Sequence, residues 1–579
     1  MPLRIVLVFF VAFITLKPDA GWASKADDFA GDGYDYTVLS DDDIDLYKEI
    51  FTLQERGEWR EADKKISALK DEVLLGYVKY QRLMHPKKYR ASYRELREWM
   101  AYYADLPDAS KVYALAKKRR TKNTSYPKRP ISRKWRIAPS TSLHPVLNDD
   151  YRAKGKSRVT KIEGRVRYLV RREQATKALK EIKSHVSRGR ITERQYDRMR
   201  SWIAASLYYQ GYIKTATRIT NEVTARNGET AVLAHWIAGL IAFRDGDMDR
   251  AFEQFSAMAA VEYQEDALRS AGAFWAARSA LASGRPKAIA KNLEIGAQYP
   301  FTFYGQLSLA QLGIDYEYDW QAPMLTETGV NRLLADHPSI KRIVALVEVG
   351  KAAEADVELR WLNGAIDSAF DYDLLALASA LDLPAAQIDI ALAGDAKYLE
   401  AGLYPIPPYA PKNGFEADRA LLYALMRQES KFKVDATSRV GARGLMQLMP
   451  RTASYIAKDR SLRRRGGRNR LYDPEFNLSL GQDYVNHLIS TSAKGSLFDM
   501  AVAYNGGPGN LRRWKRDVAL DDPLLFIESI PNPESRDFVE KVLTNIWVYR
   551  ARLGQESPTR EKVARGELPL YEALDQISH

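Results

Sequence analysis

The strongest constraint on the fold is a repeat in the middle of the chain, in which a tryptophan is followed by a glycine and then by an alanine. It occurs three times, as Trp202, Gly211 and Ala216, as Trp236, Gly246 and Ala251, and as Trp275, Gly284 and Ala288 or Ala290. Successive tryptophans are 34 and 39 residues apart, which is the length of a helix-turn-helix repeat of the tetratricopeptide kind. We expect each glycine to end a helix in a left-handed conformation and each alanine to let the next helix approach its neighbour. The pattern predicts an α-solenoid of stacked helix pairs.

The same helical character extends over residues 39–399, where alternating β-branched residues are scarce and Gly350 with Ala355 repeats the pattern once more. A chain of 579 residues is long enough for two to four domains with a large buried core. We therefore predict an all-α protein. The solenoid could bind a peptide or protein in its groove, or act as a scaffold beside an active site. We favour the scaffold, since solenoid curvature alone does not establish a binding face.

The first 23 residues have the features of a cleaved secretory signal. Arg4 supplies the positive charge, residues 5–16 are apolar, and Gly21, Trp22 and Ala23 form a small-x-small cleavage site. The apolar run is short for a membrane span, so an uncleaved anchor is the less favoured alternative. The chain has no cysteine, which excludes disulfides, thiol nucleophiles and a lipidated N-terminal cysteine. We predict a periplasmic protein without stable membrane insertion.

Charge and metal-ligand composition narrow the partners further. The formal net charge is +13, which favours an acidic partner. Export argues against nucleic acid and for a cell-wall polymer that carries carboxylates. The seven histidines are scattered without metal-ligand spacing, so we expect no metal and no cofactor. Two basic segments, 117–136 and 463–470, are interpreted as an extended connector and a mobile loop, either solvated or in contact with the anionic wall.

Four motifs follow a proline-rich linker at residues 403–411. Glu429 ends an amphipathic helical pattern, where the negative end of the helix dipole disfavours ionisation of its carboxyl group. A carboxylic acid that stays protonated near neutral pH can donate a proton to a leaving oxygen. The other three motifs are Gly444-Leu445-Met446-Gln447, Ala503-Tyr504-Asn505-Gly506-Gly507 and Pro533-Glu534-Ser535-Arg536.

In their order and spacing these motifs resemble the catalytic domain of the soluble lytic murein transglycosylases, which are relatives of goose-type lysozyme. The resemblance covers about residues 415–553 and includes the stretch 471–481. It implies a long helical superhelix, which closes into a ring in that family, followed by a lysozyme-like α domain. We accordingly expect a signal peptide at 1–23, a superhelical, U-shaped domain at 24–330, a helical linker region at 331–402 and a catalytic domain at 403–579.

The resemblance also implies an activity and its residues. The acid protonates the bond between N-acetylmuramic acid and N-acetylglucosamine, and the muramic C6 hydroxyl then closes onto C1 as a 1,6-anhydro product. Glu429 takes the catalytic position. The substrate-binding positions fall on Ser438, Met446, Gln447, Tyr504 and Asn505, and the supporting positions on Ser430, Gly444, Glu534 and Arg536. Peptidoglycan glycan strands are the expected partner, together with other cell-wall enzymes.

The residues themselves give partly independent arguments for these roles. Gly441 and Gly444 remove side chains so that the backbone can approach a bulky polymer, and Gln447 can both donate to and accept from an acetamide group. Met446 fits packing better than contact, because a thioether fills gaps well. Phe538 stands where the family often has tyrosine.

A second carboxylate, which ordinary glycosidases require, is hard to find in this sequence. The residues Asp435, Asp459, Asp473 and Asp499 each have a structural explanation. Glu534 stands at a helix start, where it can favour the dipole and pair with Arg536. We therefore favour a lytic transglycosylase. The alternatives are a hydrolytic muramidase of goose-lysozyme type and a solenoid adaptor that only binds glycan.

Overall fold

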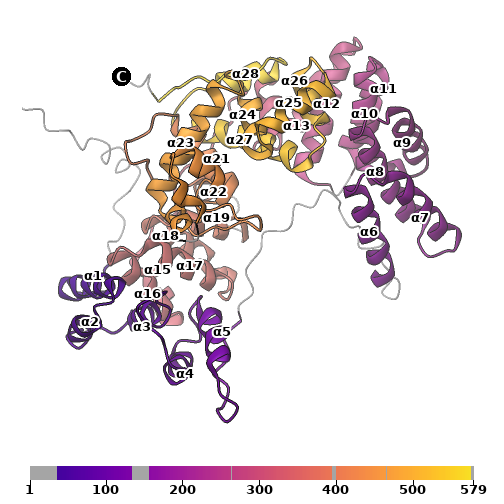
Figure 1. Ribbon diagram of the computed structural model, residues 1–579. Helices are drawn as coiled ribbons and strands as arrows, with labels where there is room; N and C mark the ends of the chain where they lie inside the picture. Colours follow the sequence, from indigo (N-terminus) through magenta and orange to yellow (C-terminus); the bar gives the residue numbers. More distant parts are fainter. Residues whose placement is uncertain (1–35, 133–155, 262–263, 394–399, 465, 576–579) are drawn as a thin grey trace, which may run out of the picture. The chain divides into compact units, whose positions relative to one another are not determined.

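The protein is all-α in the computed structural model, which describes residues 36–132, 156–261, 264–393, 400–464 and 466–575 (Figure 1). Over these ranges the only β-structure is isolated bridges, between Thr437 and Arg443, Arg443 and Leu448, and Ser496 and Leu570. The predicted fold class is thus confirmed at the level of secondary structure. The predicted signal at 1–23 lies outside the described residues. Within them, every helix is too short or too polar to cross a lipid bilayer.

The chain forms two compact units, and each unit combines two separate segments of the sequence. The first unit combines residues 1–135 with 321–402, and the second combines 136–320 with 403–579. The helices of the first unit are α1 (Asp41–Arg56), α2 (Trp59–Ile66), α3 (Leu75–Leu83), α4 (Tyr93–Tyr102), α5 (Ala109–Arg119), α15 (Glu327–Asp336), α16 (Ser339–Glu348), α17 (Ala352–Asn363), α18 (Asp371–Ala380) and α19 (Pro384–Ala393). The domain boundaries at 24–330, 331–402 and 403–579 remain predictions.

The first unit has a core shared by its two separate segments. Tyr47 and Ile50 of α1 are fully buried in one hydrophobic cluster with Ile343 and Leu346 of α16. The Tyr77 hydroxyl donates to the carboxylate of Glu358 at 2.6 Å. Apolar burial and this partly buried hydrogen bond therefore hold together segments about 280 residues apart in sequence.

The second unit contains the repeats and the C-terminal motifs. Its first segment forms α6 (Lys156–Arg171), α7 (Ala175–Ser187), α8 (Glu193–Tyr209), α9 (Ile213–Asn227), α10 (Val232–Arg244), α11 (Met248–Ala260), α12 (Asp266–Ala282), α13 (Pro286–Ala297) and α14 (Phe303–Leu312). The short α20 (Glu400–Leu403) leads into α21 (Arg419–Ser430), α22 (Pro450–Ile456), the 3₁₀ turns η5 (Arg460–Arg463) and η6 (Gly467–Tyr472), α23 (Pro474–Ser490), α24 (Leu497–Gly506), α25 (Pro508–Val518), α26 (Pro523–Ser529), α27 (Pro533–Arg552) and α28 (Pro558–Ala564).

The predicted glycine turns between paired helices are confirmed. Gly211, Gly246 and Gly284 have φ of 80°, 80° and 70°, a left-handed conformation that favours glycine. They lie between α8 and α9, α10 and α11, and α12 and α13. The three repeat tryptophans are buried, as expected for core residues.

The alanine prediction holds for two of the three pairs. Ala216 and Ala251 are fully buried, whereas Ala288 is half-buried and Ala290 is exposed. In the third pair, close approach occurs instead at Gly296 of α13, where a Cβ atom would lie 2.2 Å from Ser308 Oγ of α14. The small residue therefore occupies a later turn of α13 than the repeat predicts.

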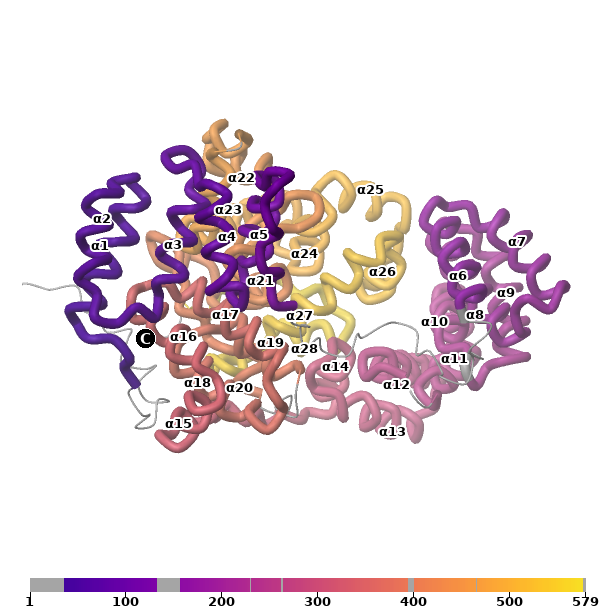
Figure 2. The backbone as a smooth tube through the Cα atoms, turned by 90° about the horizontal axis from the view of Figure 1, so that it is seen from below, coloured from indigo at the N-terminus to yellow at the C-terminus, as the bar shows by residue number. Residues whose placement is uncertain are grey.

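The helical repeats pack directly on the C-terminal helices within the second unit. Phe303 of α14 stacks on Trp547 of α27 with ring centroids 5.4 Å apart. Gln311 donates to the backbone carbonyl of Ala564 at 2.6 Å, which joins α14 to α28 (Figure 2). The end of the solenoid therefore supports α27, the helix that begins at the fourth motif.

Both basic segments are more structured than predicted. Residues 117–119 form the last turn of α5, so the irregular connector begins after them; residues 133–136 lie outside the described part. The segment 463–470 contains residues of η5 and η6 rather than a plain loop.

Candidate active site

Glu429 lies in the last turn of α21, whose apolar face is buried from Ala420 to Met426. Its side chain is half-buried. Burial and, to a smaller extent, the like charge of Glu534 raise the pKa of Glu429 from 4.5 to about 8. Loss of hydration destabilises the carboxylate and leaves the acid protonated near neutral pH. The sequence predicted this protonation state, but burial rather than the helix dipole is its main cause.

Tyr504, near the end of α24, links Glu429 to the second motif. Its hydroxyl donates to the backbone carbonyl of Met446 at 2.7 Å. Burial and the charge of Glu429 raise the pKa of Tyr504 well above its ordinary value, so this hydroxyl stays protonated and remains a donor. The ring stacks on Phe538 with planes 8° apart, which a tyrosine at that position could also do. Tyr504 therefore holds the second motif in place.

Asn505 links the third motif to the fourth. The Ser535 hydroxyl donates to Asn505 Oδ1 at 2.7 Å. Because this bond uses the carbonyl oxygen, it fixes the amide orientation and leaves the Nδ2 group as the donor. A donor suits the acetamide or ring oxygens of an amino sugar.

The loop between α21 and α22 is held by two of the predicted substrate-binding residues. Ser438 Oγ accepts from the Ala442 amide at 2.9 Å. Gln447, at φ 43°, donates from Nε2 to the carbonyls of Ala436 at 3.1 Å and Gly444 at 2.8 Å. Both amide protons of Gln447 are thereby used inside the loop, so a sugar can be bound only through its Oε1 acceptor.

Two predicted site residues, Met446 and Gly444, have packing roles in this structure. The Met446 side chain is fully buried and packs on Gly481, where a Cβ atom would lie 2.6 Å from Met446 Cγ. The side chain serves packing, the role that its thioether favours, and its predicted contact with substrate stays a prediction. At Gly444, with φ 75°, a Cβ atom would lie 2.1 Å from the Leu471 carbonyl oxygen. Packing within the domain therefore requires glycine at position 444, whereas the approach of a polymer there stays a prediction.

The predicted pairing of Glu534 with Arg536 is also not formed among the described residues. Glu534 is exposed in the first turn of α27, and its amide donates to Asn532 Oδ1 at 2.9 Å. The Arg536 guanidinium lies 3.9 Å from the centroid of the Tyr209 ring and donates to the Ile530 carbonyl. Arg536 thus fastens α27 to α8 and leaves Glu534 as the like charge that acts on Glu429.

The remaining predicted residues are explained locally. Ser430 is buried and donates to the Met426 carbonyl at 3.1 Å within α21. Asp473 accepts from the Phe476 amide at 2.8 Å as the N-cap of α23. Asp459 and Asp499 are occupied by ion pairs, with Arg470 and Lys515. The like charge that raises the pKa of Glu429 is that of Glu534.

Asn477 is a site residue that the sequence arguments missed. It is fully buried, accepts from the Met446 amide at 2.8 Å, and donates to the carbonyls of Arg443 at 3.0 Å and Leu471 at 2.8 Å. The buried Asn477 side chain therefore fixes the backbone of the second motif by hydrogen bonds. In the sequence, its position within the stretch 471–481, which the family resemblance includes, could have indicated this role.

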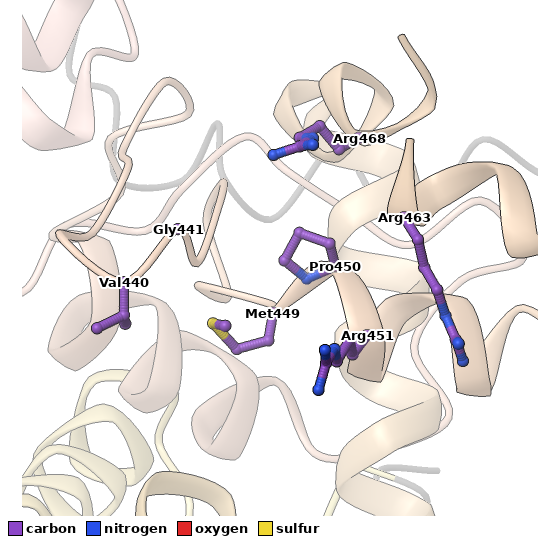
Figure 3. A pocket seen from close by; sticks show the side chains of 7 residues that line it. All are labelled: Val440, Gly441, Met449, Pro450, Arg451, Arg463 and Arg468. Atoms are coloured by element: carbon purple, nitrogen blue, oxygen red, sulfur yellow. The ribbon is translucent and has the colours of Figure 1, made fainter. Parts of the chain in front are cut away.

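A hollow of about 520 Å³ lies beside the loop that follows Glu429. Figure 3 shows its lining, which is Val440, Gly441, Met449, Pro450, Arg451, Arg463 and Arg468. Gly441, with φ 92°, has open space where a Cβ atom would stand, and the predicted approach of its backbone to the polymer stays a prediction.

Comparison with known proteins supports the assignment of this domain. The family described as Transglycosylase SLT domain matches residues 409–523. The soluble lytic murein transglycosylase of Escherichia coli strain K12 is 37% identical over 148 residues, which are 25% of this chain and 23% of that protein. A putative soluble lytic murein transglycosylase of Haemophilus influenzae is 27% identical over 302 residues, 49% of this chain and 47% of that protein. The matches thus span at most about half of these relatives.

Solved structures extend the similarity to the whole fold. The 70 kDa soluble lytic transglycosylase of Escherichia coli has a TM-score of 0.56 at 17% identity, over 90% of this chain and 98% of that chain. The complex of the 70 kDa soluble lytic transglycosylase with bulgecin A has a TM-score of 0.63 at 18% identity, with the same coverage. These similarities confirm the predicted class, a helical superhelix with a lysozyme-like α domain.

Proposed function

We propose that this chain, whose residues 409–523 form a transglycosylase SLT domain, is a lytic transglycosylase that cleaves the glycan strands of peptidoglycan. The observation that carries the proposal is the state of Glu429. Its pKa of about 8 keeps the carboxyl group protonated at neutral pH, as a general acid requires. The half-buried position at the end of α21 still leaves it accessible.

In the first step Glu429 donates its proton to the oxygen between N-acetylmuramic acid and N-acetylglucosamine, and the C1–O bond of the muramic residue breaks. In the second step the Glu429 carboxylate takes the proton of the muramic C6 hydroxyl, whose oxygen bonds to C1. The products are a shortened glycan and a 1,6-anhydromuramic end. No water is consumed, and Glu429 regains its proton.

The neighbouring residues have positioning roles in this reaction. Asn505 presents its Nδ2 donor because Ser535 occupies its Oδ1. Tyr504 and Asn477 hold opposite sides of Met446, through its carbonyl and its amide. Ser438 and Gln447 hold the loop that follows Glu429.

A hydrolytic muramidase is the second candidate, and one observation favours it. Glu534 is near enough to contribute to the pKa of Glu429, and an exposed carboxylate could activate water. Its side chain stands in the first turn of α27, where a negative charge also stabilises the helix. The glycan-binding adaptor is less favoured, because binding alone gives no role to a protonated acid.

Product analysis separates these candidates. Mass spectrometry of digested peptidoglycan should show 1,6-anhydromuropeptides, each 18 Da lighter than the hydrolytic product because one water is missing. Mainly reducing muramic ends would establish the muramidase instead. Glu429→Gln should lower the rate by at least about a hundredfold while it retains glycan binding, since the amide keeps the shape of the acid.

We further propose that the enzyme acts in the periplasm on wall glycan, in cell-wall turnover, with the helical repeats as scaffold. This rests on the predicted signal at 1–23, the excess positive charge and the direct packing of α14 on α27 and α28. Other cell-wall enzymes are proposed partners.

A further inference from the structure

Three arginines from three different segments line the hollow in Figure 3, namely Arg451 of α22, Arg463 of η5 and Arg468 of η6. Across the described part of the chain, none of them forms an ion pair with a carboxylate. Arg470 of the same basic run differs, because it pairs with Asp459 at 2.9 Å. The hollow therefore gathers uncompensated positive charge, which attracts an anion.

The positions of these arginines are built into the fold. Arg463 Nε donates to the buried Ser454 hydroxyl at 3.0 Å, which holds the side chain against α22. The Arg468 Nε–H group is buried and has no hydrogen-bond partner within the described residues. A Cβ atom at Gly467 would lie 2.2 Å from the Ser461 carbonyl oxygen, so only glycine permits this close packing of η6 on η5.

The rest of the lining is apolar and open. Val440 is 77% exposed and Met449 is 38% exposed, and Pro450 lies among the arginines (Figure 3). A small inorganic anion would gain nothing from these side chains. A carboxylate carried on an acyl or peptide arm would use the whole lining. The carboxylate would form charge-assisted hydrogen bonds with the arginines, and the arm would bury the apolar side chains.

We propose that this hollow binds a free carboxylate of the peptide stem attached to the glycan substrate. The inference rests on the proposed function, because the sugars of that polymer are uncharged in their rings and the peptide carries its acidic and apolar groups. Since Val440, Gly441 and Met449 belong to the loop that follows Glu429, a bound stem would also fix that loop. The hollow then makes cleavage sensitive to whether a stem is present and charged.

The test measures binding of short glycans to the full chain that carries Glu429→Gln, so that ligands are not consumed. Three ligands of equal glycan length are compared, with free-acid stems, with amidated stems and without stems. We expect free-acid stems to bind about tenfold to a hundredfold more tightly than amidated stems, as expected for one or two hydrogen bonds to a charged group.

Two triple variants with equal loss of charge identify the hollow. Arg451→Gln, Arg463→Gln and Arg468→Gln together should bring the ratio of free-acid to amidated affinity close to one, with affinity for stem-free glycan unchanged. The matched control replaces exposed arginines outside the lining, Arg439→Gln, Arg460→Gln and Arg464→Gln, and should preserve the ratio. Lysine at the three hollow positions should restore part of it, because the charge is retained.

Equal affinity of the Glu429→Gln chain, with its arginines intact, for glycans with free-acid and with amidated stems would overturn the inference. So would an equal loss in both triple variants, which would show general electrostatic attraction, or a loss of stem-free binding in the hollow variant. In each of these cases cleavage to anhydro products would still stand, so the proposed function would survive. Absence of binding of every glycan to the Glu429→Gln chain, together with absence of cleavage by the protein that retains Glu429, would overturn both proposals.

Discussion

The hydroxyl of Tyr504 donates a 2.7 Å hydrogen bond to the backbone carbonyl of Met446. This bond spans 58 residues and joins the third motif to the second. The same tyrosine is close enough to Glu429 for that carboxylate to raise the pKa of its hydroxyl. One side chain therefore couples the position of the loop to the proposed acid.

Tyr504→Phe tests this coupling. The variant leaves the buried Met446 carbonyl without its partner, so we expect a loss of about 1 kcal/mol in the free energy of unfolding and a lower kcat. Tyr484→Phe is the control. The ring centroids of Tyr484 and Tyr504 are 5.4 Å apart, and the Tyr484 hydroxyl donates to no described residue. Denaturant unfolding and glycan cleavage measure the two effects. Equal behaviour of both variants would contradict the role of the Tyr504 hydroxyl.

The pH profile of cleavage should show Glu429. A general acid works only when protonated, so kcat/KM should fall as pH rises through about 8. Glu534→Gln removes the like charge and should move this limb to lower pH, but not to the ordinary carboxyl range, because burial remains. Glu475→Gln, also an exposed first-turn residue after a proline in α23, should leave the limb in place. If kcat/KM of the Glu534→Gln variant falls at the same pH as in the unsubstituted protein, Glu534 does not act on Glu429.

Stability should depend on pH through the same group. The folded-state pKa of Glu429 is raised above its ordinary value of 4.5 to about 8, so the folded protein holds this proton more tightly than the unfolded chain. The stabilising contribution is complete below the ordinary value and is lost as pH rises through about 8. Glu429→Gln has no such dependence, so the Tm of this variant should rise relative to the Tm of the unsubstituted protein between about pH 4.5 and pH 8. A constant difference in Tm over this range would argue against the raised pKa.

Two glycines of one loop should respond differently to alanine. Both have positive φ, which costs a non-glycine residue about 1 to 2 kcal/mol. At Gly441 the space is open, whereas at Gly444 the new Cβ would meet the Leu471 carbonyl and Asn477. We expect Gly444→Ala to lower the free energy of unfolding by more than about 4 kcal/mol. Gly441→Ala should lower it only by the cost of the positive φ. Similar unfolding free energies would contradict the packing assigned to Gly444.

Binding to intact sacculi should weaken with salt. The net charge of +13 draws the protein to an anionic wall by long-range attraction, which is screened within about 10 Å at 0.1 M salt. Cosedimentation of the Glu429→Gln chain with sacculi over a series of salt concentrations measures this attraction without digestion. Binding that is independent of salt would assign the retention to glycan contacts alone.

The sequence by itself determined features that depend on a few neighbouring residues. The glycine turns at Gly211, Gly246 and Gly284, the helix that ends at Glu429 and the helix that begins at Pro533 were all predictable. Helical periodicity, proline and left-handed glycine act over a single turn, so they are visible in the linear chain.

Tertiary structure decided the environment of each site residue. Burial set the pKa of Glu429, and the like charge came from Glu534, 105 positions further along the chain. The packing contacts of Met446 and Gly444 could not be predicted, because the surfaces they face, Gly481 and the segment 471–477, are brought to them only by folding. Desolvation and close packing depend on which distant segments meet, whereas residue type and spacing record only what each segment could do.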